Sequence, residues 1–194
     1  MAQKRADMIA DTRAKLIAAA RHAFATKGYA DTAMEDLTAA AGLTRGALYH
    51  HFGGKKGLLE AVIDQIDAEM AERLRIVIEA ASTVWDGFVA ENVAWLELAL
   101  EPEIQRIVLL DGPAALGDRE RWGAGSECHL STRRTIEALL ADKIIAPVDP
   151  EATAHLVNGA VLNAALWIAN ADEPAEAAAD AVASLRVLLD GLLL

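Results

Sequence analysis

Apolar side chains recur every three or four residues along most of this chain, and glycine or proline interrupts the recurrence at intervals. This spacing places apolar residues on one face of an α-helix. Helical patterns cover about residues 12–27, 55–82, 84–100, 103–110, 118–143, 150–171 and 174–193. The clearest run has an apolar residue at every fourth position: Leu58, Val62, Ile66, Met70 and Leu74. No segment is convincing as a strand, so the sequence predicts an all-α protein with about nine helices.

The composition of the 194 residues supports a folded core. Hydrophobic residues make up 54% of the chain, which excludes disorder as its overall state. The single cysteine, Cys128, excludes a disulfide scaffold and fits a reducing cytosol. We interpret Cys128 as a buried structural thiol and expect the protein to be cytoplasmic.

One stretch is long and apolar enough to require a choice between a core helix and a membrane span. Residues 152–171 carry no formal charge, but they include His155, Asn158, Asn163 and Asn170. Amides and imidazoles are costly in hydrocarbon. We therefore expect a buried helix and no membrane partner.

The charge is unevenly distributed. Residues 1–60 hold nine Lys/Arg and six Asp/Glu, a net charge of +3, although the whole chain carries −11. The remaining residues therefore carry −14. Such asymmetry is typical of a chain with two tasks, in which the small basic part meets a polyanion.

Helix signals near the N-terminus predict a helix-turn-helix. Thr32 and Glu35 have the spacing of a capping box, and Gly42 ends the helix that follows. Thr44 then caps another short helix, which Gly53 and Gly54 end. A tight glycine turn between two short helices is the helix-turn-helix pattern, whose second helix enters the DNA major groove.

Specific residues in this region carry a family resemblance. They are Thr44-Arg45-Gly46-Ala47-Leu48-Tyr49-His50-His51-Phe52 and Gly53-Gly54-Lys55-Lys56-Gly57-Leu58-Leu59, preceded by Ala23-Phe24, Gly28-Tyr29, Asp36-Leu37 and Ala40-Ala41-Gly42-Leu43. Over residues 10–60 the chain closely resembles the tetracycline-repressor (TetR/AcrR) family of bacterial transcription regulators. The resemblance implies a DNA-binding domain at residues 1–57, with its motif at about 33–52. A long helix would join it to an effector-binding and dimerisation bundle at residues 58–194.

The candidate DNA-binding residues are Thr32, Ala33, Thr44, Arg45, Gly46, Ala47, Tyr49, His50 and Lys55. Arg45 can bind guanine O6 and N7 together, or it can bond a phosphate. Thr32 and Thr44 cap helix starts whose free amides suit phosphate. His51 faces away and packs or caps. The adjacent histidines His50 and His51 point in different directions, and no Cys, Asp or Glu lies at ligand spacing from them, so we expect no metal ligands. We also expect no cofactor.

The effector region is harder to assign. Its candidates are Trp85, Phe88, Trp95, Val108, Trp122, His129, Arg133, Asn158, Asn163 and Trp167. The tryptophans either line a cavity or form ordinary core. Asn158 and Asn163 need a partner, which is a ligand, a backbone group or a second subunit. Arg106 and Asp111 are expected to form a local ion pair.

The last two helices, at about 150–171 and 174–193, have matching start signals, since Asp149 before Pro150 and Asp172 before Pro174 are expected N-caps. Both helices are rich in alanine and leucine and predict a four-helix interface between two copies of the chain. The small residues Gly159, Ala160, Ala164 and Ala165 would allow close approach. Leu188, Leu189 and residues 192–194 would otherwise leave an exposed apolar patch.

The function expected from these features is a homodimeric repressor that a small molecule releases from a palindromic operator. The alternatives are an activator, a DNA-binding regulator controlled by a protein partner, and a helical small-molecule-binding protein or enzyme that binds no DNA. No catalytic constellation supports an enzyme. The sequence does not identify the operator, the regulated genes or the effector.

Overall fold

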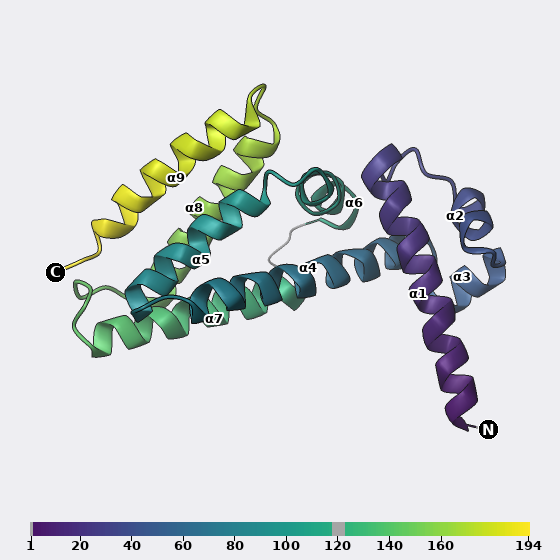
Figure 1. Cartoon of the computed structure of the whole chain (residues 1–194), viewed down its shortest axis with the longest axis horizontal. Coiled ribbons are helices and arrows are strands. Elements are labelled where there is room, and N and C mark those ends of the chain that lie inside the picture. Colours follow the sequence, from purple (N-terminus) through teal and green to yellow (C-terminus); the bar gives the residue numbers. More distant parts are fainter. Residues whose placement is uncertain (1, 118–122) are drawn as a thin grey trace. The chain divides into compact units, whose positions relative to one another are not determined.

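The structure is a computed structural model, and it describes residues 2–117 and 123–194 (Figure 1). All regular elements in these ranges are helical, as the apolar spacing predicts. The one extended pairing there is an isolated antiparallel bridge between Ile145 and Leu193, beside which the Ala146 amide donates to the Leu192 carbonyl at 2.7 Å.

The described part of the chain contains nine α-helices and one π-helical segment, η1. Their bounds are α1 Ala2–Lys27, α2 Met34–Ala41, α3 Arg45–Phe52, α4 Lys55–Glu79, α5 Val84–Leu98, η1 Ile104–Asp111, α6 Gly112–Leu116, α7 Gly123–Ala141, α8 Pro150–Ala169 and α9 Pro174–Asp190. The first helix begins at Ala2 rather than near residue 12, so α1 is longer than its apolar stripe.

Two compact units divide the chain. One consists of Met1–Ile66 with Arg106–Gly117, and the other of Asp67–Gln105 with Asp118–Leu194. The first unit therefore contains a segment that lies far from it in sequence. The functional boundary expected at residue 57 concerns what each part binds, and it stays a prediction.

The first unit is built around α1 and the start of α4. The four-residue spacing in α4 places Leu58, Val62 and Ile66 in the core. Leu16, Phe24, Leu37 and Leu48 of α1, α2 and α3 are fully buried as well. This core fixes the short helices α2 and α3, which are too short to be stable alone.

The inserted segment of the first unit is tied to the end of α1 by polar contacts. The Asp111 carboxylate accepts the Tyr29 backbone amide at 2.7 Å and the Arg106 Nε at 3.3 Å, which confirms the expected Arg106–Asp111 pair. Arg106 also donates to the Lys27 carbonyl at 3.5 Å. Gly28 has a φ of +87°, and a Cβ there would lie 2.0 Å from Arg106 Nη2. The left-handed φ favours glycine here, and any side chain would also have to displace the arginine head.

In the second unit α5, α7, α8 and α9 pack against one another. Asp149 caps α8 as expected, since its carboxylate accepts the Ala152 amide at 2.8 Å. The cap expected at Asp172 is wrong: Glu173 precedes α9 and makes no side-chain cap bond. Cys128 was expected to be buried, but it is exposed on α7 because the core side of that helix is formed by Thr132, Ile136 and Leu139.

Helix α8 alone among the described helices is long and apolar enough to cross a membrane, with a mean hydropathy of 1.3 over its most apolar stretch. Only 33% of that stretch is buried within one chain. Its exposed apolar residues include Leu156 and Trp167, so the expected burial of this helix is incomplete in a single copy.

Candidate nucleic-acid interface

The turn between α2 and α3 is set by one glycine. Gly42 has a φ of +66°, in the left-handed region that glycine adopts without strain. Its amide donates to the Ala39 carbonyl at 3.1 Å, and the Leu43 amide donates to the Thr38 carbonyl at 2.9 Å. These bonds close α2 and let the chain enter α3 within three residues.

Helix α3 is held from one side only. Leu48 is fully buried in the core of the first unit. From α1, Arg13 donates to the His51 carbonyl at 2.9 Å, and its guanidinium lies 4.5 Å from the centre of the Phe52 ring. His51 is half-buried, in line with the packing role expected for it.

The opposite side of α3 is open to solvent. The exposed residues of α3 are Arg45, Gly46, Tyr49 and His50. The last three follow Arg45 by one, four and five residues, and this spacing places all four on one helical face. Ala47 is half-buried beside them. The structure thus brings the expected base-reading residues together on one surface.

Arg45 is oriented by two neighbouring side chains. Its Nη1 lies 2.8 Å from Glu35 Oε1 of α2, and its guanidinium lies 5.6 Å from the centre of the Tyr49 ring. Hydrogen bonding to Tyr49 and then the negative charge of Glu35 raise the pKa of Arg45 above its usual value. The bond to Glu35 uses Nη1, one of the three guanidinium nitrogens.

The ends of the neighbouring helices carry further candidates. Thr44 caps α3, as expected, and its hydroxyl accepts the Ala47 amide at 3.2 Å. Lys55, the first residue of α4, donates to the Ala30 carbonyl at 3.3 Å, and its ammonium lies 4.4 Å from the centre of the Tyr29 ring.

The expected cap at Thr32 is wrong. Thr32 is 2% exposed, and its hydroxyl donates to the Gly28 carbonyl at 2.7 Å. Ala33 takes the N-cap position of α2 instead and provides no side-chain cap bond. The hydroxyl is used to satisfy the end of α1, so a side-chain contact from Thr32 to a ligand is not available in this conformation.

The expected effector residues do not form one group. Trp85, Phe88 and Trp95 lie on α5, where the Trp85 and Phe88 ring centres are 5.9 Å apart. Phe88 is buried, while both tryptophans are half-buried. Val108 is buried in the first unit, and Trp122 lies outside the described residues.

Other effector candidates lie where α7 and α8 pack together. His129 and Arg133 of α7 both approach Glu151 of α8, and the Thr132 hydroxyl donates to Asn158 Oδ1 at 3.0 Å. The partner of Asn158 is therefore α7 of the same chain. Asn163 and Trp167, in contrast, are exposed on α8.

Glu151 and His155 were missed as members of this group, although a signal was present. They lie four residues apart on α8, and residues at that spacing share a helical face.

Comparison with known proteins identifies the family. Residues 16–62 match the family model described as bacterial regulatory proteins, tetR family. Residues 85–192 match the tetracyclin repressor-like C-terminal domain model. The chain belongs to the TetR family. These matches confirm the predicted fold and the family resemblance of residues 10–60. As a member of this family, the chain is a DNA-binding transcriptional regulator.

Curated relatives of this TetR-family chain are similar mainly at the N-terminus. The regulator TtgR of Pseudomonas putida is 45% identical over 56 residues, which cover 29% of this chain and 27% of that protein. The repressor AcnR of Corynebacterium efficiens is 33% identical over 97 residues, 49% of this chain and 50% of that protein. The chain thus matches about a quarter to a half of the length of these relatives.

Solved TetR-family structures are similar over nearly the whole chain. A TetR-family transcriptional regulator from Pectobacterium atrosepticum is 50% identical, with a TM-score of 0.88 and coverage of 97% of both chains. A TetR regulator from Chloroflexus aurantiacus is 24% identical, with a TM-score of 0.75, 96% of this chain and 98% of that chain being covered. The second comparison shows the shared fold alone.

Proposed function

We propose that the protein is a repressor that binds a palindromic operator as a homodimer and leaves it when a small molecule binds. The observation that carries this proposal is the exposed face of α3, on which Arg45, Gly46, Tyr49 and His50 lie together without burial. A short helix held only from behind is suited to enter the major groove.

Arg45 is the proposed base-reading residue. Its planar head can donate to O6 and N7 of one guanine, a contact that contributes about 1–3 kcal/mol of discrimination. Glu35 holds the same guanidinium in the free protein. Operator binding is proposed to replace the bond to this exposed carboxylate with a bidentate contact to a base edge.

Contacts to the phosphate backbone of DNA are proposed to come from helix ends and from one lysine. The N-terminus of α2 has no side-chain cap, so its first amides suit a phosphate oxygen. Lys55 can release the Ala30 carbonyl for a phosphate. Such contacts supply most of the affinity and fix the register of α3, and Gly46 and Ala47 permit close approach.

Dimerisation is proposed through α8 and α9. Leu156 is 74% exposed and Trp167 51% on α8, and Val187 is 72% exposed and Leu188 67% on α9. A second copy would cover these side chains in a four-helix arrangement. The set of contacting residues differs from the expected one: Ala165 and Leu189 are buried within their own chain, while Gly159 and Ala160 are exposed.

The effector is proposed to bind in the second unit beside α5, where Trp85 and Trp95 are half-buried. Glu91 lies between them in sequence, and burial raises the pKa of its carboxyl. The strongly acidic composition of the chain beyond residue 60 disfavours a highly anionic effector. We further propose that the protein acts in the cytoplasm and catalyses no reaction.

Selection from random duplexes, followed by gel shifts on the recovered sequence, tests operator binding. We expect a palindromic site and, for about eight neutralised phosphates, a slope of log affinity against log salt of roughly −7. The double variant Arg45→Ala with Lys55→Ala should lose this binding. No enriched site at low salt would overturn the proposal and favour a small-molecule-binding protein without DNA activity.

Effector release and the sign of regulation need a second experiment. A compound library is screened by thermal shift, and each hit is added to the gel shift and to a reporter carrying the operator. Release of DNA and a rise in reporter expression support a repressor. A fall in reporter expression on release would identify an activator.

A further inference from the structure

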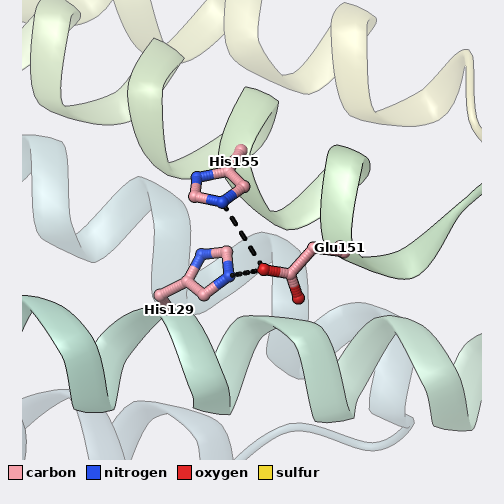
Figure 2. A group of neighbouring side chains, drawn as sticks. All are labelled: His129, Glu151 and His155. Carbon is pink, nitrogen blue, oxygen red and sulfur yellow. Dashed lines mark hydrogen bonds and ion pairs between the residues drawn. The ribbon is translucent and has the colours of Figure 1, made fainter.

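Three side chains from two helices converge on a single oxygen atom in the second unit. His129 Nε2 of α7 lies 3.0 Å from Glu151 Oε1 of α8, and His155 Nε2 of α8 lies 3.5 Å from the same oxygen (Figure 2). The ligand atoms of all three residues lie within 4.8 Å of one another. We propose that His129, Glu151 and His155 bind one divalent transition-metal ion of the Zn²⁺ class.

The spacing of these atoms matches a metal site. Zinc bonds to nitrogen and oxygen are about 2.0–2.2 Å long, so two ligand atoms at a tetrahedral ion lie roughly 3.3 Å apart. The two measured nitrogen-to-oxygen separations, 3.0 and 3.5 Å, bracket that value. Small rotations of the side chains would be enough to admit the ion.

The ligand types select the class of ion. Two imidazoles and one carboxylate favour zinc, copper, nickel or cobalt over Mg²⁺ and Ca²⁺, which prefer oxygen ligands. The two imidazole ring centres are 4.1 Å apart with planes 32° from parallel. Two such rings that both aim a nitrogen at one oxygen are suited to a shared cation.

Neighbouring contacts hold the two helices in register around this site. Glu151 and His155 share a face of α8 at a spacing of four residues. One turn along, the Thr132 hydroxyl bonds to Asn158 and joins α7 to α8. Arg133 Nε lies 3.7 Å from Glu151 Oε2, the other carboxylate oxygen, which leaves Oε1 to the ion.

Glu151 is exposed and His129 is only partly buried, so the site is open to solvent and retains at least one coordination position for water or another ligand. The inference goes beyond the proposed repressor function and does not depend on it, since metal binding is measured without DNA.

The test is isothermal titration of the tag-free, metal-free full-length protein with ZnCl₂, together with the visible absorption of the Co²⁺ form. We expect one equivalent of Zn²⁺, cobalt bands typical of low coordination number, and no competition from excess MgCl₂. His129→Gln and Glu151→Gln should each weaken binding at least about tenfold. His22→Gln is the matched control, because His22 is exposed on α1, and it should bind like the wild type.

Circular dichroism and thermal unfolding in the absence of metal show whether each variant is folded, and the wild-type cobalt spectrum is independent of the variants. The proposal is overturned if the wild type takes up no stoichiometric zinc. It is equally overturned if folded His129→Gln binds zinc as tightly as the His22→Gln control.

Discussion

Arg45 is the residue on which specificity is proposed to depend. Its guanidinium is bonded to Glu35 and lies over the Tyr49 ring, so two neighbouring side chains orient it. Lysine has the same charge but lacks the planar fork that binds two acceptors.

Replacement of Arg45 should therefore separate specific from non-specific binding. We expect Arg45→Lys to weaken operator affinity by about 1–3 kcal/mol, with a smaller change on unrelated DNA. Competition gel shifts measure both affinities. Arg75→Lys is the control, because Arg75 is an exposed arginine of α4 that is paired with Glu72 and Glu79 in the other unit. Equal losses on operator and unrelated DNA would show that Arg45 contacts phosphate only.

Glu91 is a second residue with a measurable consequence. Burial raises the pKa of its carboxyl above the usual value of 4.5. The folded state therefore holds this proton more tightly than the unfolded state. Its stabilising contribution is fully present below the unfolded pKa and is lost as the pH rises through the folded pKa.

Glu91→Gln should thus raise the melting temperature at pH 7 and have little effect near pH 4. Glu97→Gln, at an exposed position of the same helix, serves as the control and should not show this pattern. Thermal unfolding between pH 4 and pH 8 provides the comparison. If Glu91→Gln is less stable than the wild type at pH 7, the charged carboxylate has a partner whose interaction outweighs the cost of its desolvation.

At the scale of elements, the joint between α3 and α4 allows little freedom. A Cβ on Gly57 would lie 2.0 Å from the Phe52 carbonyl oxygen, which is backbone and cannot rotate away. A Cβ on Gly46, in the first turn of α3, would have as its nearest neighbour the Thr44 side-chain oxygen, 3.8 Å away. The two glycines occupy similar helical positions but differ in the space around them.

Gly57→Ala is accordingly expected to destabilise the fold by about 1–3 kcal/mol through overpacking. Gly46→Ala should be neutral or stabilise by up to about 1 kcal/mol, because alanine favours helix. Chemical denaturation measures both. If Gly57→Ala is as stable as Gly46→Ala, the α3–α4 joint is less rigid than the structure indicates.

The elements also show which features can be predicted from sequence. The caps at Thr44 and Asp149 can be predicted because each cap bond involves only an amide three residues further along the chain. The prediction for Thr32 fails because α2 begins one residue later, with Ala33 at its N-cap, and the buried Thr32 hydroxyl donates to the Gly28 carbonyl instead. His129 and Glu151 are 22 residues apart in sequence and meet across α7 and α8, and no local pattern fixes the register of these two helices.

For the whole molecule, the exposed apolar side chains of α8 and α9 predict the oligomeric state. We expect Trp167→Glu and Leu188→Glu each to convert a dimer into monomers. In a two-fold interface each substitution places two carboxylates, one from each subunit, in a buried position without a partner. Sedimentation velocity at micromolar concentration reads the mass, and operator gel shifts should fail in parallel.

The control for these changes is Ile76→Glu. Ile76 of α4 is 55% exposed and lies outside the proposed interface. It should leave the dimer intact. A wild-type monomer, or a dimer that survives both α8 and α9 substitutions, would contradict the proposed assembly.

The segment Arg106–Gly117 gives the first unit a boundary in two parts, because residues on both sides of the segment belong to the other unit. A graft that transplants only residues 1–66 onto a relative would leave behind Asp111, the acceptor of the Tyr29 amide, and the buried Ile107 and Leu109. Chimeric regulators built from this chain therefore need two cuts in the recipient gene rather than one. Where a chimera is not built, operator preference has to be changed by substitutions on the surface of α3.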